Sequence, residues 1–379
     1  MTRFLNFRTL LLLSLLALAG FVASQPYLQQ ALLHGTADID DHEVFANRTV
    51  KAGPHQPWKV APDYNRKPLS DSARRAIESY ETVAFLVIQR GEIRHEEYWE
   101  GYGTASLSNS FSVTKGIVSL LVGIAIDEGK IKNVDQPVGD FIPAFREGKN
   151  AQLTIKHLLT MSSELDWDES YFNPFSVTTK AYYGNNLTDL VMGLKVVKEP
   201  GLVNKYLSGN TQLLGFVVER ATGKTLSDYA SEKLWQPLGA QHAALWSLDR
   251  EDGKEKAYCC FNSNARDFAR LGQLVPNKGQ WNGRQLVSEA YVAAAISRAG
   301  YLKDEAGTFV DYYGYQFWVV DHKDLRIPYF RGILGQYIFV IPERNAVVVR
   351  LGKDSDRPIN HHHPDIRVYL DAALELLDK

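Results

Sequence analysis

The sequence predicts an α+β fold in which an antiparallel sheet is flanked by helices, with an all-helical part inserted between the two halves of the sheet. Three observations support this prediction: two strand patterns lie early in the chain, several helical patterns fill its middle, and further strand patterns followed by one helix lie near its end. A helical insertion explains this order better than two consecutive domains do. With 379 residues, of which 45% are hydrophobic and 23% charged, the chain can bury a full core.

The first residues have the pattern of an export signal. Arg3 and Arg8 precede an apolar run at 10–22, which is too short for an ordinary membrane-spanning helix. Small residues near Ala23 would admit cleavage, although no clean A-x-A motif stands there. Residues 1–24 are therefore expected to be either a signal peptide or an N-terminal membrane anchor. The protein is accordingly expected outside the cytoplasm, in the periplasm or attached to the inner membrane.

The main domain is expected to begin after a lead-in segment. Residues 25–70 have a mixed composition broken by prolines, which predicts an extended lead-in rather than a domain. Residues 71–379 are expected to form one domain. It begins with a helix over 71–80, capped by Asp71 or Ser72.

The first half of the sheet is predicted to be a hairpin. Residues 82–99 contain two strands, one rich in β-branched residues and one alternating, joined by a turn at Arg90 and Gly91. Residues 116–128 have the apolar density of a helix buried on most sides, and Gly129 ends it.

The helical insertion is expected over approximately residues 135–260. Four segments carry its helical patterns: TIKHLLTMSS, LTDLVMGLKVV, NTQLLGFVVERATG and LSDYASEKLW. After one more helical pattern in NARDFARLGQLV, the chain returns to strands in YGYQFWVV, QYIFVIP and AVVVRLG, and DIRVYLDAALELL predicts a closing helix. A run of three histidines at 361–363 is expected to be solvated.

Charge and cysteine content restrict the partners. A formal net charge of -2 without a concentrated basic stripe makes nucleic acid a poor candidate. The two cysteines, Cys259 and Cys260, are adjacent, and neighbouring cysteines do not easily reach relaxed disulfide geometry. We expect them to be small buried side chains without a disulfide. No His or Cys at metal-ligand spacing accompanies them, and neither a metal nor an organic cofactor is expected.

Ser112 and Lys115 stand three positions apart where an apolar helix begins. A serine hydroxyl must give its proton to a base when it attacks, and residues three apart on a helix share one face. Lysine can be that base only if burial or nearby positive charge lowers its pKa, and the apolar flank supplies burial. The backbone N–H of Ser112 would also be available to an oxyanion. Taken alone, however, the pattern fits an ordinary capped helix start equally well.

Four segments together resemble the serine β-lactamase-like family, which includes penicillin-binding proteins, class C β-lactamases, esterases and 6-aminohexanoate-dimer hydrolases. The segments are SFSVTKGIVSLLVGIAIDEGKI, LTIKHLLTMSSELDWDE, NKYLSGNTQLLGFVVERATGKTLSDYASEKLWQPLGA and NARDFARLGQLVPNKGQWNGRQLVS. The resemblance covers roughly residues 80–351 in the motif order of the family. It implies a β-lactamase/transpeptidase-like fold and catalysis through an acyl-enzyme.

The resemblance also implies roles for individual residues. Ser112 resembles the acylated nucleophile and Lys115 the base beside it. Tyr206 resembles the tyrosine that passes a proton to the leaving group, a role that suits a phenol hydrogen-bonded to an ammonium. Ser208 stands where the antibiotic-hydrolysing members have asparagine, and it is similar to the 6-aminohexanoate-dimer hydrolase branch.

The third motif of the family, Lys-Thr-Gly or His-x-Gly on a strand, is matched only weakly by Phe330, Arg331 and Gly332. Gly332 would let the strand edge approach a substrate, and the Ile333 N–H would be the second oxyanion donor beside that of Ser112. The missing cation at the first position makes recognition of a β-lactam carboxylate doubtful, unless Arg331 turns inward.

A cluster of Trp167, Asp168, Glu169 and Tyr171 is expected to line a loop over the site, where Asp168 or Glu169 either binds a substrate amine or is simply solvated. The sequence as a whole predicts an exported serine hydrolase that cleaves a small ester or amide. Two alternatives stay open: a D-alanyl-D-alanine peptidase or β-lactamase, and a non-catalytic penicillin-binding-like sensor or scaffold.

Overall fold

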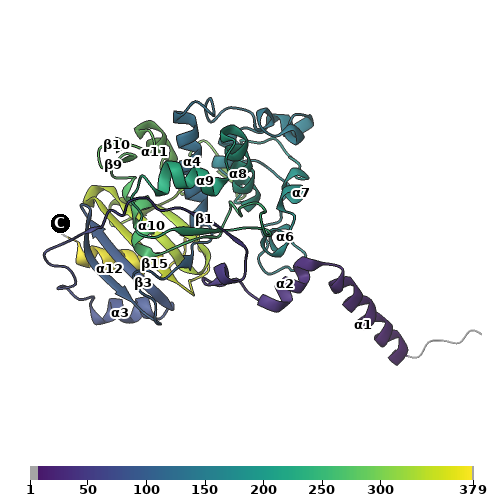
Figure 1. Ribbon diagram of the computed structural model, residues 1–379, viewed down its shortest axis with the longest axis horizontal. Coiled ribbons are helices and arrows are strands. Elements are labelled where there is room, and N and C mark those ends of the chain that lie inside the picture. The colour runs from purple at the N-terminus through teal and green to yellow at the C-terminus, as the bar shows by residue number, and fades with distance from the viewer. Residues whose placement is uncertain (1–6, 378–379) are drawn as a thin grey trace, which may run out of the picture.

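The computed structural model describes residues 7–377, and its largest element is a seven-stranded sheet (Figure 1). The strand order is β12-β13-β14-β15-β3-β4-β2, and every neighbouring pair is antiparallel except β2 with β4. The strands are β2 (Lys59–Val60), β3 (Thr82–Gln89), β4 (Glu92–Tyr98), β12 (Trp318–His322), β13 (Leu325–Gly332), β14 (Gln336–Ile341) and β15 (Ala346–Gly352). This confirms the predicted α+β fold with an antiparallel sheet.

The central strands of the sheet, β3, β14 and β15, are buried on both faces. Successive residues of a strand point to opposite faces. On β3, Leu86 and Ile88 accordingly belong to the core that contains α4 (Val113–Asp127) and α10 (Ala265–Gln273). Phe85 and Val87 belong to the core on the other face, beneath α3 (Asp71–Glu78) and the closing helix α12 (Ile366–Leu376). Burial on both faces explains why β3 is a continuous apolar run rather than an alternating one.

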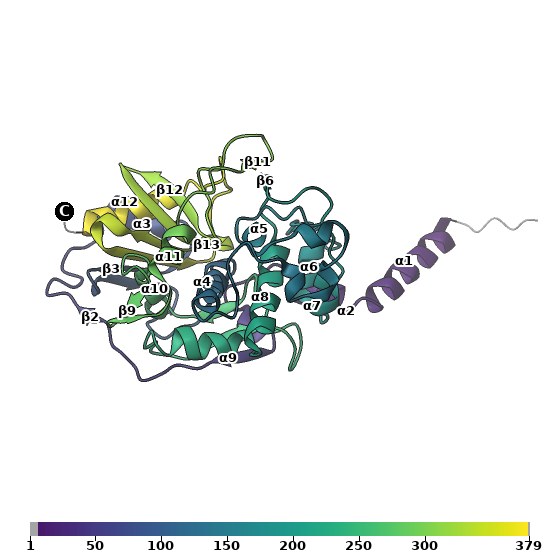
Figure 2. The ribbon, with the colours of Figure 1, turned by 90° about the horizontal axis from the view of Figure 1, so that it is seen from above.

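A helical part lies beside the sheet (Figure 2). Its helices are α5 (Ile155–Leu159), α6 (Val177–Tyr183), α7 (Leu187–Met192), α8 (Ser208–Thr222) and α9 (Leu226–Ala230), followed by a π-helix at Ser231–Trp235. Further elements between α4 and β12 include β6 (Val203–Asn204), β9 (Gln280–Trp281), β10 (Arg284–Gln285), α11 (Glu289–Ala295) and β11 (Lys303–Asp304). Parallel pairing of β11 with β6 links the helical part to the segment before β12.

Two predicted details near the start of the domain have different outcomes. The hairpin of β3 and β4 is confirmed, and its turn residues Arg90 and Gly91 both have positive φ (54° and 78°), as a two-residue turn between twisted strands requires. The cap of α3 (Asp71–Glu78) is neither Asp71 nor Ser72. Ser70 is the N-cap, and its hydroxyl accepts a hydrogen bond from the Ala73 N–H.

The segment expected as an extended lead-in, residues 25–70, contains α2 (Pro26–His34), a 3-10 turn (Asp41–Glu43) and two short strands. One of these, β1 (Asn47–Val50), is the edge of a second, four-stranded antiparallel sheet. Its order is β1-β7-β8-β5, with β7 (Ala244–Ser247), β8 (Phe261–Ser263) and β5 (Ser108–Asn109). The second sheet therefore ties the lead-in segment to the chain just before Ser112.

The N-terminal helix α1 (Phe7–Ala23) extends away from the rest of the molecule (Figure 1). The first six residues, with Arg3 of the predicted export signal, lie outside the described residues. Within residues 7–377, no single helix is long and apolar enough to cross a membrane. Leu11–Ala23 and Pro26–His34 pass that test only as a pair, which is bent by 97°.

The cysteines differ from expectation. Cys259 and Cys260 form a disulfide, although the sequence predicted two unlinked side chains. Cys260 has a positive φ of 71°, a conformation that is uncommon for a residue other than glycine. Both residues are buried, with 4% and 0% of their surface exposed.

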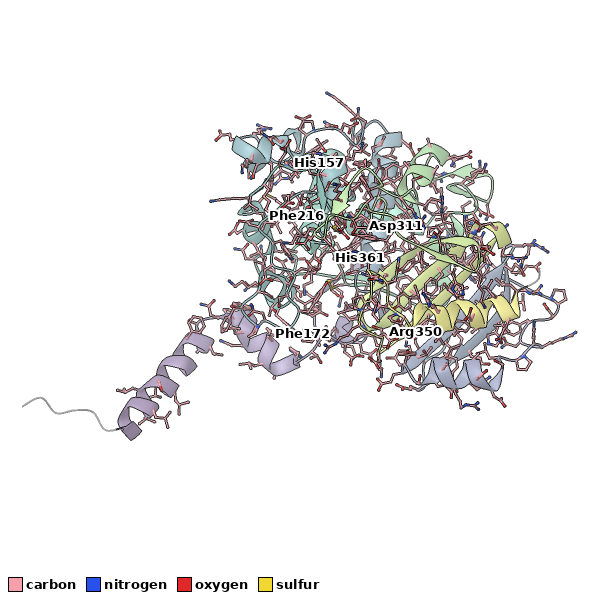
Figure 3. The ribbon with its side chains drawn as sticks, turned by 180° about the vertical axis from the view of Figure 1, so that it is seen from behind. His157, Phe172, Phe216, Asp311, Arg350 and His361 are labelled. Atoms are coloured by element: carbon pink, nitrogen blue, oxygen red, sulfur yellow. A yellow bond between two sulfur atoms is a disulfide. The ribbon has the colours of Figure 1, made fainter. Side chains whose placement is uncertain are left out.

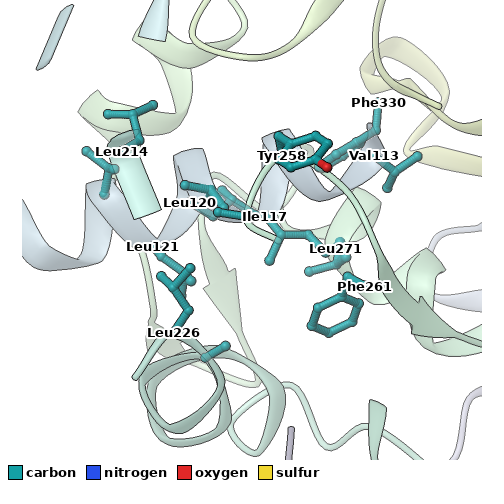
Figure 4. Close-up of a cluster of buried hydrophobic side chains, with 14 of the residues drawn as sticks. Val113, Ile117, Leu120, Leu121, Leu214, Leu226, Tyr258, Phe261, Leu271 and Phe330 are labelled. Atoms are coloured by element: carbon teal, nitrogen blue, oxygen red, sulfur yellow. The ribbon is translucent and has the colours of Figure 1, made fainter. Parts of the chain in front are cut away.

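Helix α4 is the centre of the core between the sheet and the helical part. From Val113 to Ala125 every residue is buried. Figure 4 shows its side chains among those of α8, α9 and the sheet. The closest approach is at Gly116, where a Cβ atom would lie 2.3 Å from Cδ1 of Phe330.

We expect Gly116→Ala to lower the free energy of unfolding by about 1–3 kcal/mol, because overpacking of a filled core outweighs the gain in helix propensity. Gly103→Ala is the matched control. A Cβ at position 103 would meet no atom within 4 Å, and its effect should stay within about 0.5 kcal/mol. Urea denaturation of both variants measures the difference, and a stabilised Gly116→Ala protein would contradict the packing described above.

Candidate active site

Strand pairing and a backbone hydrogen bond hold the segment that precedes Ser112 in place. Asn109 pairs with Asn262 across β5 and β8, and the Ser110 N–H donates to the Phe261 carbonyl at 3.1 Å. Phe111 then has a positive φ of 45°, which is uncommon for a bulky residue and is typical of constrained functional sites. Ser112 follows as the N-cap of α4. In the stretch 108–125 it is the one residue that is not buried, so its side chain is presented at the surface of the core.

Lys115 is buried, with 1% of its surface exposed, and its ammonium nitrogen points at Ser112. Nζ lies 2.8 Å from Ser112 Oγ, 3.1 Å from Ser208 Oγ and 2.8 Å from the carbonyl oxygen of Tyr258. Burial lowers the pKa of Lys115 to about 7, with a smaller lowering by the Arg331 charge and an opposing effect of Glu169. A large fraction of the amine is therefore neutral near pH 7 and able to accept a proton.

Tyr206 lies between the Lys115 side chain and the edge of the sheet. Lys115 Nζ is 5.1 Å from the centroid of its ring, and the ring packs 5.5 Å from the indole of Trp318 and 6.2 Å from Tyr313. Burial raises the pKa of Tyr206, and a hydrogen bond with Ser112 lowers it by a smaller amount. The phenol is thus protonated at neutral pH and has a proton to pass on.

Ser208, at the start of α8, connects Lys115 to a carboxylate. Its backbone N–H donates to Glu169 Oε2 and its hydroxyl donates to Glu169 Oε1, both at 2.6 Å. The Tyr171 hydroxyl donates to the same Oε1 at 2.6 Å. Because the Ser208 proton is directed at Glu169, its oxygen presents a lone pair to Lys115. Glu169 therefore orients Ser208, and three donors already occupy its oxygens.

The predicted loop cluster divides into two groups. Glu169 and Tyr171 belong to the hydrogen-bond network around Ser208. Tyr171 lies at the outer edge of this network, with 46% of its surface exposed. Trp167 is buried beneath it, donates its indole N–H to Thr178 and packs against the start of α8. Asp168 is exposed and accepts from a backbone N–H of its own loop, so the structure does not bring its carboxylate into the network.

The end of β13 lies against the segment that leads into the nucleophile. A Cβ at Gly332 would be 2.3 Å from the Ser110 carbonyl oxygen and 3.2 Å from Phe111 Cβ, so that only glycine permits this approach. Ile333 follows directly, next to the beginning of α4. In the described part of the chain the Ser112 N–H has no hydrogen-bond acceptor. The two backbone N–H groups predicted to hold an oxyanion are therefore carried by adjoining segments.

Phe330 and Arg331 point to opposite faces of the sheet. The Phe330 ring packs against Gly116 and lies 4.7 Å from the ring of Phe317, so the first position of the third motif is a core residue. Arg331 lies on the other face, with Cζ 3.3 Å from the centroid of Trp318. Its Nη1 donates to the carbonyl oxygen of His361 at 2.6 Å.

Two of the three histidines at 361–363 differ from the expectation of a solvated run, whereas His361 is exposed as expected. His362 and His363 are half-buried, and burial lowers the pKa of each to about 4. His362 Nδ1 is hydrogen-bonded to the Tyr329 hydroxyl at 2.8 Å, and the His361 ring stacks on Tyr312 at 3.8 Å. The loop that carries them is therefore packed against the sheet beside Arg331.

Sequence reasoning missed Tyr258 and Trp318. Tyr258 contributes its backbone carbonyl, which no side-chain pattern can reveal, and its ring lies 5.7 Å from Lys115 Nζ. Trp318 was expected only as part of a strand, although it contacts both Tyr206 and Arg331. Arg331 itself was noted as a residue that could turn inward, and nothing in the sequence shows that it stacks on an indole.

Comparison with known proteins identifies the family. The model of the family described as Beta-lactamase matches residues 72–369. The 6-aminohexanoate-dimer hydrolase of Paenarthrobacter ureafaciens is 28% identical over 297 residues, which cover 74% of this chain and 75% of that protein.

Solved structures agree on the fold. A Bacillus anthracis protein assigned as a 6-aminohexanoate-dimer hydrolase superposes with a TM-score of 0.74 at 22% identity, over 93% of this chain and 96% of that one. A family VIII carboxylesterase superposes with a TM-score of 0.63 at 19% identity, over 85% and 99%. The β-lactamase-like fold that the sequence resemblance implied is thereby confirmed. The chain belongs to the beta-lactamase family and is a serine hydrolase.

Proposed function

We propose that this protein hydrolyses a small ester or amide through an acyl-enzyme on Ser112. The proposal rests on one contact above all: the buried amine of Lys115, with a pKa of about 7, lies 2.8 Å from Ser112 Oγ. A lysine kept partly neutral beside a solvent-reaching serine is an activated nucleophile. An ordinary helix cap would need neither the burial of the lysine nor its contact with the hydroxyl.

The first half of the reaction uses the residues around Ser112. Lys115 accepts the hydroxyl proton as Ser112 Oγ bonds to the substrate carbonyl carbon, and the carbonyl becomes an oxyanion. The N–H groups of Ser112 and Ile333 would hold this oxyanion. Tyr206 passes its proton to the leaving alcohol or amine as the scissile bond breaks, and it recovers a proton from Lys115.

The second half of the reaction releases the acyl group. Water attacks the acyl carbon and gives its proton to the same lysine and tyrosine system, and the bond to Ser112 Oγ breaks as that oxygen is reprotonated. The carboxylic acid then leaves. Ser208 and Glu169 serve as positioning residues, because their hydrogen bonds hold Lys115 in reach of the nucleophile.

The substrate class is supported by the relatives and by one residue of the site. Proteins named 6-aminohexanoate-dimer hydrolase and carboxylesterase share the fold and most of the length of this chain. Ser208 stands where antibiotic-hydrolysing members have asparagine, and its hydroxyl is used to orient Lys115. Both observations favour esters or small amides over β-lactams.

A screen of p-nitrophenyl esters of graded chain length, run beside the 6-aminohexanoate dimer, tests the proposal. We expect turnover of at least one of these substrates and labelling of Ser112 by a fluorophosphonate. Absence of both would contradict the proposed function and favour a sensor or scaffold. Covalent labelling by a fluorescent penicillin, with no turnover of esters or the dimer, would favour a peptidase or β-lactamase instead.

We also propose that the protein is exported. The support is the apolar segment 10–22 after Arg3 and Arg8, and the projection of α1 from the molecule. We expect full-length protein to fractionate with the periplasm or the inner membrane, and a chain starting at Gln25 to stay in the cytoplasm. Recovery of the full-length chain from the cytosol with its N-terminus intact would overturn this.

A further inference from the structure

The Cys259–Cys260 disulfide lies between two backbone contacts of the active site. Directly before it, the Tyr258 carbonyl accepts a hydrogen bond of 2.8 Å from Lys115 Nζ. Directly after it, the Phe261 carbonyl accepts a hydrogen bond of 3.1 Å from the Ser110 N–H, in the segment that leads into the nucleophile. The two cysteines are thus the only residues between a contact to the base and a contact to the nucleophile segment.

The disulfide restricts the backbone between these contacts. A bond between neighbouring side chains closes a small ring, and this ring contains the planar peptide bond that joins the two residues. The ring limits the two backbone rotations inside it, which are the ψ of Cys259 and the φ of Cys260. Rotation about either bond changes the direction of Tyr258 relative to Phe261. Cys260 has a φ of 71°, whereas an unlinked cysteine favours a negative φ.

The peptide unit that carries the Tyr258 carbonyl has few other contacts that fix it. Within residues 7–377, Tyr258 makes no hydrogen bond except the one with Lys115, and its hydroxyl is buried without a partner. The N–H of the same peptide unit belongs to Cys259 and donates to the Lys256 carbonyl at 3.1 Å. Because Cys259 belongs both to this peptide unit and to the disulfide ring, the ring determines where the carbonyl points.

Breaking the disulfide would displace this backbone. Both cysteines are buried, and the Ala257 N–H just before the stretch donates to Gln212 Oε1 of α8 at 2.8 Å. Phe216, one turn further along α8, marks this helix in Figure 3. Sulfur atoms that are no longer bonded must move apart, and a close-packed interior has no space for this unless the chain shifts. Since both ends of the stretch are hydrogen-bonded, the shift falls on Tyr258 and the cysteines.

We propose that the Cys259–Cys260 disulfide is a positioning element of the active site, which holds the Tyr258 carbonyl at Lys115 and makes the oxidised protein more active than the reduced one. The inference rests on the proposed function, in which Lys115 is the base. Reduction by a dithiol breaks the S–S bond and forms two S–H bonds, while the dithiol becomes a disulfide and supplies the two electrons and two protons. Because disulfides persist in oxidising compartments and not in the cytoplasm, activity would depend on the compartment.

Reduction of the wild-type protein tests the proposal, since the chain has no other cysteine. The protein is treated with dithiothreitol, which is then removed by gel filtration because thiols cleave activated esters. Alkylation and mass measurement count the free thiols. We expect kcat for a p-nitrophenyl ester above about pH 8 to fall at least about tenfold, with KM changed less than about threefold. Reoxidation with diamide should restore the activity.

The pH profile distinguishes positioning from a general loss of structure. The Tyr258 carbonyl accepts a hydrogen bond from the charged form of Lys115 and favours that form, so its displacement should lower the pKa of Lys115. We therefore expect the midpoint of kcat/KM against pH to move from about 7 to a value about one unit lower in the reduced protein. A smaller folded population alone would leave the midpoint unmoved.

Variants without the disulfide give a second test that does not depend on access of the dithiol to a buried bond. Cys259→Ser, Cys260→Ser and the double variant should each show the lower kcat and the lower midpoint. The double variant is also the control, because dithiothreitol should leave its activity unchanged. Either an unchanged kcat or an unmoved midpoint in these variants would overturn the proposal. Failure of the untreated wild type to hydrolyse the esters, together with no fluorophosphonate label on Ser112, would overturn the proposed function instead.

Discussion

Ser112→Ala is expected to lower kcat/KM for a p-nitrophenyl ester at least about a thousandfold, because the atom that forms the acyl-enzyme is gone. The fold should be almost unaffected. Ser112 is the N-cap of α4, yet its side chain makes no capping hydrogen bond, so alanine removes no cap. Steady-state kinetics and urea denaturation of the same preparation measure the two effects.

Ser119→Ala is the appropriate control for this variant. It removes a serine from the same helix, where the hydroxyl contacts Tyr291 at 3.1 Å and no catalytic group. We expect it to retain activity and to lose some stability. Fluorophosphonate labelling followed by peptide mapping should modify Ser112 alone, and modification of a different serine, or activity retained by Ser112→Ala, would refute the assignment.

Lys115→Arg is expected to cause a loss of similar size, because a guanidinium stays protonated at any pH at which the protein is folded and cannot act as the base. Lys130→Arg, at an exposed position just beyond the end of α4, is the conservative control and should have wild-type activity. A Lys115→Arg protein with more than about a tenth of wild-type kcat/KM would show that the base is a different group.

The titration of Lys115 also predicts how the activity of the wild-type protein depends on pH. Only the neutral amine of Lys115 accepts a proton, and its pKa is about 7. Below that pH the neutral fraction falls about tenfold per unit, so kcat/KM should rise with pH through about 7 and level off above it. A profile that is flat from about pH 5.5 to 8, or that falls with rising pH, would contradict this.

Elements with strong local signals were predictable from the sequence. The hairpin of β3 and β4 has β-branched strands and a turn whose two residues accept positive φ, and α4 has a long apolar run ended by Gly129. The second sheet has strands of only two to four residues, too short for any periodicity, and it was not predicted. Its pairings come from tertiary contacts rather than from local preference.

The same distinction holds within the site. The contact of Lys115 with Ser112 follows from helical spacing, and the sequence predicted it. The link from Glu169 to Ser208 joins a loop to the first residue of α8, which is distant in sequence, and the Tyr258 carbonyl is a backbone group, so neither has a signature in residue types. The disulfide was missed because Cys260 has a positive φ, a backbone conformation that residue types do not predict.

The pairing of β3 with β15 has a consequence for the order in which the chain folds. Val87 lies opposite Val348, so the middle of the large sheet joins the beginning of the domain to its end. Such a pairing closes a very long loop, whose entropy must be lost before the contact contributes, and folding should therefore be slow. β15 is the last strand in the sequence and lies between β14 and β3, so the central strands cannot pair until β15 has left the ribosome. The nascent chain is therefore incompletely folded throughout its synthesis. An incompletely folded chain can be translocated across a membrane, as the proposed export would require.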